Sequence, residues 1–133
     1  NIDNYAIDGF SADSLQTANQ LSVVCNLPVN AVEQGSTLSI NATVENKSEQ
    51  DIMLTSSVYP MSLEFILFDK NGFTTTDVSL QNGVTVLPRR QKTNIVFDCK
   101  IPSTVKGEYT FGIGFATIFG CTLNSNLKKI NIH

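Results

Sequence analysis

The sequence predicts an all-β protein, an antiparallel β-sandwich of eight or nine strands. Three observations carry this prediction. Short stretches alternate apolar and polar side chains with the period of two that a half-buried strand requires. Turn-forming residues separate these stretches roughly every ten residues. No stretch shows sustained helical periodicity. A chain of 133 residues is long enough for one domain with two packed layers.

Each strand is bounded by residues that end or turn a chain. Pro28 ends the first strand, and Pro60 separates the strand at 52–58 from the apolar strand at 61–68. Asn71 and Gly72 supply the positive φ angles of a hairpin turn, and a second Asn-Gly pair stands at 82–83. The expected strands are residues 21–26, 38–45, 52–58, 61–68, 74–80, 84–87, 93–101, 107–116 and 127–132. The Thr-rich strand 74–80 is expected at a sheet edge, and the whole pattern fits an immunoglobulin-like or jelly-roll sandwich.

The alternation also predicts which side chains form the core, because successive side chains of a strand point to opposite faces. The predicted core comprises Leu38, Ile40, Val44, Leu63, Phe65, Ile95, Phe97, Phe111, Ile113 and Phe115.

The first twenty residues differ from the rest. They are polar and lack sustained periodicity, so we expect residues 1–20 to form a lead-in or tether and residues 21–133 to form the sandwich domain.

Composition excludes some partners. The net charge is −3 and only 16% of residues are charged, which argues against nucleic-acid binding because that needs a basic surface. No run approaches the roughly 20 apolar residues of a membrane span. The three cysteines leave two alternatives open: buried thiols in a reducing compartment, or a Cys25–Cys99 bridge with Cys121 spare. Sequons at Asn41 and Asn46 would permit glycosylation in a secretory protein.

No catalytic or cofactor motif is present, so we expect a non-enzymatic domain without cofactor or metal. The one histidine, His133, ends the sequence, and the cysteines lack the close spacing of metal ligands. The carboxylates are scattered, and no nucleotide-binding P-loop occurs. Residues 69–72 (DKNG) match only the start of a calcium loop and lack its distal acid.

Two polar strand faces are the best candidates for a ligand site. If the strands that carry them belong to one exposed sheet, they offer paired donors and acceptors suited to sugar hydroxyls. Two arginines lie in the turn before the second of these strands. Their planar guanidinium groups would pair with the carboxylate of an acidic sugar. The candidate glycan-binding residues are Asn41, Thr43, Asn94, Asp98, Lys100, Arg89 and Arg90.

The strand 107–116 has one bulky face and one nearly bare face. The bare face, with Gly112, Gly114 and Ala116, is where another chain or a flat ligand could approach closely. The polar segment 122–126 is expected to be a loose hinge before the final strand.

Three segments resemble the C-terminal carbohydrate-binding domain of Wzt, the nucleotide-binding subunit of bacterial O-antigen ABC exporters. They are residues 33–40 (EQGSTLSI), 63–72 (LEFILFDKNG) and 107–114 (GEYTFGIG). The resemblance covers about residues 21–133. The sequence has no Trp for stacking on a sugar, which leaves Tyr59, Phe73 or Tyr109 as aromatic substitutes.

The resemblance implies a β-sandwich that recognises the terminal part of a lipid-linked O-antigen polysaccharide at the cytoplasmic face of the inner membrane. It implies a homodimer, and contact with the transporter's membrane subunit through a parent protein. The sequence itself offers two routes to the dimer, exchange of strand 127–132 or contact through the glycine-bearing face. The alternative is an extracytoplasmic (periplasmic or extracellular) immunoglobulin-like structural or adhesion domain, or an inhibitor-like interaction domain.

Overall fold

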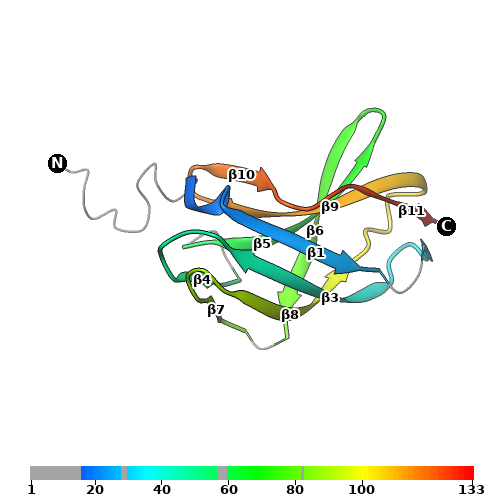
Figure 1. Ribbon diagram of the computed structural model, residues 1–133. Coiled ribbons are helices and arrows are strands. Elements are labelled where there is room, and N and C mark those ends of the chain that lie inside the picture. Colours follow the sequence, from blue (N-terminus) through cyan, green and yellow to red (C-terminus); the bar gives the residue numbers. More distant parts are fainter. Residues whose placement is uncertain (1–15, 28–29, 57–59, 82) are drawn as a thin grey trace.

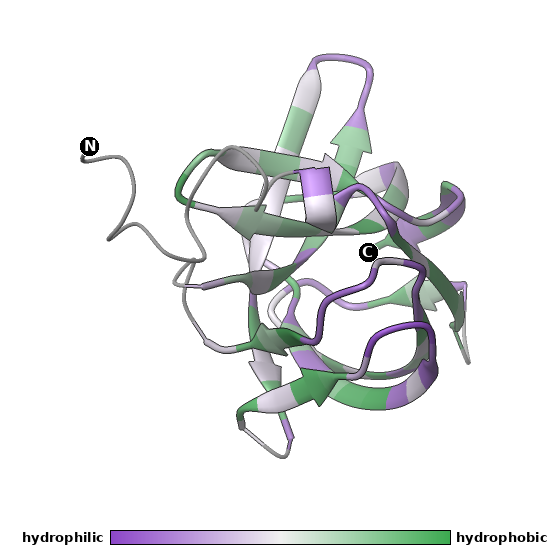
Figure 2. Cartoon of the chain, turned by 60° about the vertical axis from the view of Figure 1, so that its left-hand side comes forward, coloured by the Kyte–Doolittle hydropathy of each residue, from purple (hydrophilic) through white to green (hydrophobic). Residues whose placement is uncertain are grey.

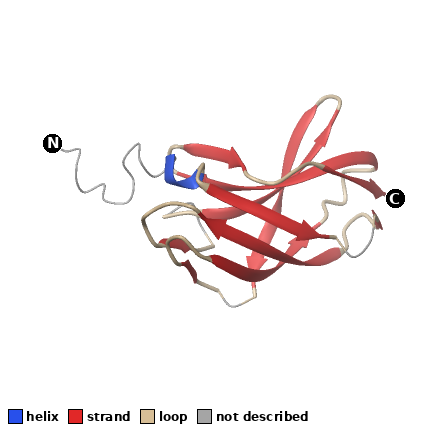
Figure 3. Cartoon of the chain, in the orientation of Figure 1, coloured by secondary structure: helices blue, strands red, loops and turns tan. Residues whose placement is uncertain are grey.

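The computed structural model describes residues 16–27, 30–56, 60–81 and 83–133. The described residues are almost entirely strands, apart from one helical turn at residues 16–18 (Figure 3). The strands, labelled in Figure 1, are β1 (Leu21–Asn26), β2 (Ala31–Val32), β3 (Thr37–Asn46), β4 (Ile52–Leu54), β5 (Ser62–Asp69), β6 (Gly72–Leu80), β7 (Thr85–Leu87), β8 (Lys92–Lys100), β9 (Gly107–Thr117), β10 (Gly120–Leu123) and β11 (Lys128–Ile132). The predicted all-β class is confirmed.

The main sheet curls into two layers that face each other. Its strand order is β1-β3-β8-β6-β5-β9-β11-β2, with β10 added beside β9, and β4 pairs with β7 in a small separate sheet. β6 carries the sheet from one layer to the other. Its first half pairs with β5, and residues from Asp77 onward pair with β8. We call β1, β3, β8 and the end of β6 the first layer, and the start of β6 with β5, β9, β10, β11 and β2 the second layer.

The predicted edge position of the Thr-rich strand is wrong, because β6 lies between β8 and β5 in the strand order. Its two halves pair with different strands, the first half with β5 and the second half with β8. The strand predicted at residues 52–58 is shorter in the structure, where β4 ends at Leu54. Residues 57–59, which include the end of that predicted strand and Tyr59, lie outside the described residues.

The core fills the space between the two layers. All ten predicted core residues are buried, and Phe65 stacks on Phe111 with ring centroids 5.0 Å apart. The turns are mostly hydrophilic, most visibly the hairpin between β5 and β6 (Figure 2). The alternation along each strand thus identified the buried faces correctly.

The domain begins earlier than predicted. Ala18 is fully buried in the core and Thr17 is 8% exposed. The Asn124 side chain holds this segment by donating to the carbonyls of Ala18 and Leu21, both at 2.8 Å. The boundary after residue 20 is therefore wrong, because the last residues of the expected tether pack onto the sandwich.

The segment 122–126 is not a loose hinge. Its first two residues belong to β10, and the amides of Asn124 and Ser125 both donate to the carbonyl of Ile113. The Ser125 hydroxyl accepts from the Ile113 amide at 2.7 Å. β11 then pairs with β9 of its own chain and, in parallel, with β2. Hydrogen bonds from both the backbone and a side chain therefore fix the segment that was expected to be the hinge for strand exchange.

The bare face of β9 is covered by this same segment. A Cβ atom on Gly112 would lie 2.6 Å from Leu123 Cδ1, and one on Gly114 would lie 1.8 Å from the carbonyl oxygen of Thr122. The expectation that this face is open to another backbone is wrong. The chain itself makes the close approach that the glycines permit.

The cysteines are free, and the strand register excludes a Cys25–Cys99 bridge. Cys25 lies opposite Ala42 and Cys99 lies opposite Leu38, so β3 separates the two thiols. Two strand spacings are about 10 Å, whereas bridged cysteines need Cα atoms within about 7 Å.

Candidate functional site

The structure brings the five predicted strand residues together on the outer face of the first layer. β3 and β8 are adjacent and antiparallel, and their register sets Thr43 opposite Asn94 and Ser39 opposite Asp98. Asn41 lies between these two rows, and Lys100 ends the face opposite Thr37. The condition that both strands belong to one exposed sheet is therefore met.

Much of the hydrogen-bonding capacity of this face is already used. The Thr43 hydroxyl donates to Asn94 Oδ1 at 3.4 Å. Gln81, which follows β6, donates from Nε2 to Ser39 Oγ and to Asp98 Oδ1, both at 3.3 Å. The outward positions of β3, β8 and the part of β6 from Asp77 onward hold no aromatic side chain on which a sugar ring could stack. The face is a flat polar surface with few free groups.

Arg89 and Arg90 stand apart from this face, in the turn that leads into β8. Arg89 pairs with Asp51 at 3.9 Å, and Arg90 pairs with Glu49 at 3.5 Å and donates to the carbonyl of Lys47. Arg90 adopts a positive φ of 59°, which suits a tight turn. The two guanidinium groups thus brace the β3–β4 connection and do not join the strand residues.

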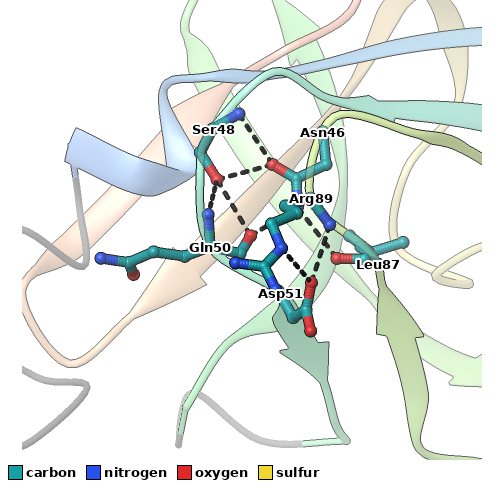
Figure 4. A network of polar contacts seen from close by, with 6 residues as sticks. All are labelled: Asn46, Ser48, Gln50, Asp51, Leu87 and Arg89. Atoms are coloured by element: carbon teal, nitrogen blue, oxygen red, sulfur yellow. Dashed lines mark hydrogen bonds and ion pairs between the residues drawn. The ribbon is translucent and has the colours of Figure 1, made fainter.

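The second sequon, residues 46–48, lies in the same β3–β4 connection and has a structural role. Asn46 is fully buried, and its Nδ2 donates to the carbonyls of Gln50 and Leu87 at 2.8 and 2.9 Å (Figure 4). Its Oδ1 accepts from the amide and the hydroxyl of Ser48. Asn46 and Ser48 are therefore structural, because they satisfy the backbone of a turn. Asn41 of the first sequon is exposed.

A hollow of about 490 Å³ opens at one end of the second layer. Four segments distant in sequence form it: the end of β5, the start of β9, β11, and the residues at the start of β2. Its lining residues are Asn30, Ala31, Phe68, Asp69, Lys70, Glu108, Tyr109, Thr110, Lys129, Ile130 and Asn131. A volume of 300–1,000 Å³ is typical of small-ligand sites.

The strand register orders the hollow into two rows. Phe68, Thr110 and Lys129 lie side by side in one row, and Glu108 and Asn131 lie opposite each other in the next. The row of Phe68 continues to Phe73 on β6, whose ring centroid is 6.3 Å from that of Phe68. Phe68 therefore lines the hollow with Phe73 beside it, and the polar side chains of Glu108 and Asn131 form the next row.

The polar side of the hollow has free hydrogen-bonding groups. Among the described residues, the side chains of Glu108, Lys129 and Asn131 make no hydrogen bond or ion pair. Asp69 is engaged, since its Oδ1 accepts from the amide of Asn71 at 2.8 Å and shapes the predicted hairpin turn. Free donors and acceptors beside aromatic rings are what a sugar requires.

A smaller polar recess of about 270 Å³ lies where β5 and β6 separate between the layers. Glu64, Asp77 and several hydroxyl side chains line it. Burial raises the pKa of Glu64, and the Ser62 hydroxyl, which donates to Glu64 Oε2 at 3.2 Å, partly lowers it.

The thiols are held in their neutral form. Burial raises the pKa of Cys99 to about 12; the Thr76 hydroxyl lowers it and Asp98 raises it further. Burial also raises the pKa of Cys25, and the Lys128 ammonium partly lowers it. Burial raises the pKa of Cys121, and the Glu64 carboxylate raises it further. None of these thiols is activated as a nucleophile.

Among the described residues, no group of three or more His, Cys, Asp and Glu side chains gathers as metal ligands would. Within the same ranges, no helix is long and apolar enough to cross a membrane.

Of the aromatic residues named from the sequence, Tyr109 lines the hollow and Phe73 adjoins it. Sequence reasoning missed Phe68, Glu108, Lys129 and Asn131. Each lies on the outward face of a correctly predicted strand, but only the strand order shows that these faces are neighbours.

No protein-family model matches this sequence, and no curated protein is similar to it in sequence. Among solved structures, the chain is similar to the Pseudomonas fluorescens alkylpurine DNA glycosylase AlkC bound to DNA, with a TM-score of 0.56 and 10% identity over 94% of this chain and 34% of that one. It is also similar to Listeria innocua β-glucosidase in complex with gluconolactone, with a TM-score of 0.52 and 9% identity over 84% of this chain and 16% of that one. The chain thus spans about a third or less of these proteins, and at such identities the likeness shows the fold alone.

Proposed function

We propose that this domain is a non-catalytic module that binds a glycan in the hollow of the second layer. The observation that carries the proposal is that the Phe68 ring lies beside the free polar groups of Glu108, Lys129 and Asn131. Apolar sugar faces stack on aromatic rings, and sugar hydroxyls pair with carboxylate, amide and ammonium groups. The first-layer face lacks the rings and has fewer free groups.

The resemblance to the O-antigen exporter domain makes the terminal part of a lipid-linked O-antigen polysaccharide the first ligand to test. On this proposal the domain adjoins an ATPase domain of a parent protein and reaches the transporter's membrane subunit through it. Three unbridged thiols support a reducing compartment, and therefore the cytoplasmic side of the inner membrane.

The test is a screen of purified O-antigen polysaccharides and a panel of neutral, acidic and amino oligosaccharides, followed by calorimetric titration of those that bind. Phe68→Ala and Asn131→Ala should each weaken binding by about tenfold or more, because each removes a group that contacts the sugar. Asn94→Ala, on the first layer, is the matched control and should bind normally.

Two results would count against the proposal. If Asn94→Ala loses binding while the hollow variants keep it, the site is the first-layer face that the sequence predicted. If no glycan binds the wild-type chain, the domain is not a glycan module.

A second candidate is an immunoglobulin-like adhesion or inhibitor-like domain that acts through its loops outside the cytoplasm. It is favoured by Ile118 and Phe119, which are 55% and 46% exposed in the turn between β9 and β10. Exposed apolar side chains at a loop tip suit a protein partner. Serine at both positions would abolish partner binding in this case and leave glycan binding unchanged.

A further inference from the structure

β6 leaves β5 partway along its length, and beyond that point it has a strand on one side only. It pairs with β5 as far as Thr76, and residues 77–80 pair with β8. Figure 1 shows the two strands together in the hairpin and apart beyond it. The side of residues 77–80 that faces away from β8 is therefore a strand edge, which we call the β6 edge.

The backbone of the β6 edge directs polar groups into the gap that β5 leaves. The Gln81 amide donates to the carbonyl of Val96 at 3.0 Å, so the backbone groups of Gln81 face β8. Because these groups alternate in direction along a strand, those of Val78 and Leu80 face away from β8. The Leu80 carbonyl agrees with this, since it accepts from the Gly83 amide in the following turn. Within the described part of the chain, the amide and the carbonyl of Val78 have no hydrogen-bond partner.

The opposite edge of the first layer, by contrast, is capped. Along β1, the amide of Val23 donates to the carbonyl of Asn124, and Lys128 Nζ donates to the carbonyl of Cys25 at 2.7 Å. Residues 77–80 (DVSL) contain neither the lysine nor the proline that protects many natural edges, and their register with β8 has no bulge. The β6 edge is therefore able to accept a further strand.

Two carboxylates flank the gap beside this edge. The register sets Phe65 opposite Thr76, so Glu64 and Asp77 form the next row, where the two strands part. Both line the polar recess of about 270 Å³. Glu64 is half-buried, and within the described ranges neither carboxylate makes an ion pair. Burial of a carboxylate is unfavourable without a cation beside it, so the gap favours a positively charged partner.

The inner face of the β6 edge is apolar and incompletely covered. Val78 lies opposite Cys99 and Leu80 lies opposite Phe97, and both partners are fully buried. Val78 and Leu80 pack against the core but stay partly exposed. Apolar side chains of an added strand, in the same rows, would cover them.

We propose that the β6 edge binds an extended peptide of a partner protein in which apolar residues alternate with lysine or arginine. The peptide adds a strand to the first layer, and its backbone pairs with the amide and carbonyl of Val78 and with the amide of Leu80. Its apolar side chains cover Val78 and Leu80. Its basic side chains, on the other face, lie beside Glu64 and Asp77. In such strand addition the main-chain bonds supply affinity and the alternate side chains supply specificity.

The probe is a fluorescein-labelled synthetic peptide of alternating valine and lysine, which places valine on one face of a strand and lysine on the other. Fluorescence anisotropy with the 133-residue chain should give a dissociation constant below about 100 µM. Two matched peptides separate the contributions. One replaces every lysine by glutamate, and the other is N-methylated at every residue, which removes the backbone donors and keeps the charges. Each should bind at least about tenfold more weakly.

Val78→Pro tests the edge directly. Proline removes an amide that faces away from β8, so the pairing of β6 with β8 remains and the melting temperature should change little. The variant should bind the lysine peptide about fivefold more weakly or worse. Asp77→Lys is a second test that does not depend on how the proline variant folds, and it should prefer the glutamate peptide by about tenfold. The matched control is Glu33→Lys, which reverses an exposed charge outside the recess and should bind like the wild type.

Three results would overturn the proposal. The first is no binding of the lysine peptide to the wild type at about 1 mM. The second is an N-methylated peptide that binds as tightly as its parent, because the contact would then be only electrostatic. The third is an Asp77→Lys variant that keeps the wild-type preference for lysine.

Peptide binding goes beyond the proposed glycan binding, and the two can fail separately. Asp77 and Val78 do not line the hollow, and Phe68 does not line the recess. Phe68→Ala should therefore keep peptide binding, and Asp77→Lys should keep glycan binding. A chain that binds the peptide but no glycan would leave the β6 edge as proposed and refute only the glycan module.

Discussion

Replacing Gly114 by alanine should destabilise the domain far more than the same change at Gly112, two residues earlier on the same face. The new Cβ at position 114 would lie 1.8 Å from the carbonyl oxygen of Thr122, 2.9 Å from its carbonyl carbon and 3.3 Å from Leu123 Cα. All three are backbone atoms, so no side-chain rotation relieves the clash. An ordinary carbon–oxygen contact is about 3.3 Å, so β10 must move by about 1.5 Å.

The magnitude follows from what that movement breaks. Overpacking in a tight interior costs about 1–3 kcal/mol. The amides of Asn124 and Ser125 both donate to Ile113, and each bond contributes about 1 kcal/mol. We therefore expect Gly114→Ala to lower the free energy of unfolding by about 3–5 kcal/mol.

Gly112→Ala is the matched control. Its Cβ meets the ends of two leucine side chains, Leu123 Cδ1 at 2.6 Å and Leu127 Cδ2 at 3.0 Å, and both can rotate toward solvent. Alanine also favours an extended strand over glycine by roughly 0.5–1 kcal/mol, so the net change should stay within about 1 kcal/mol. Urea denaturation followed by far-UV circular dichroism measures both variants. Equal stabilities for the two would refute the argument that backbone packing on Gly114 is rigid.

Three further predictions follow from burial and bonding. Phe111→Ala should cost about 3–5 kcal/mol in the same assay, because the ring is 1% exposed in the core; a loss below about 1 kcal/mol would mean that the strand faces are inverted. Asn46→Ala should cost about 2–4 kcal/mol, since it leaves buried turn groups unpaired, whereas the exposed Asn41→Ala should change stability by under about 0.5 kcal/mol; equal effects would contradict the structural role of the turn. Because the pKa of Cys99 is raised to about 12, its neutral thiol stabilises the fold fully below the ordinary thiol pKa of 9.0, and that contribution disappears as the pH rises toward 12. A disulfide reagent at pH 8 should label the exposed Cys121 first and reach Cys99 only after denaturation, and rapid native labelling of Cys99 would show that its strand opens readily.

Within each strand, the sequence was a reliable guide because burial there depends on local geometry. Leu38, Ile40 and Val44 alternate with polar residues, and successive side chains of any strand point to opposite faces whatever its neighbours are. The same reasoning succeeded for Phe111, Ile113 and Phe115 on β9. Turns were equally local, since Asp69 and Gly72 close the hairpin that their residue types predict.

The segment 122–126 shows where local reasoning failed. Its polar composition is typical of a loop, but Asn124 and Ser125 bond to Ile113, Ala18 and Leu21 across the sandwich. The sequence would be the same if these side chains faced solvent, so it does not reveal that they form these bonds. Whether a polar side chain caps a distant backbone group depends on which strands meet, and strand order is a property of the whole chain.

By itself, then, the sequence determined the all-β class and the inward side chains, because a period of two is built into every strand. Only the tertiary structure decided that β9 lies between β5 and β11, which places Phe68, Thr110 and Lys129 in one row and forms the hollow. It also decided that the glycine face is filled by the chain's own β10 segment. The physical reason is that pairing between strands far apart in sequence is selected by the packing of the complete core, and no single stretch of residues contains that information.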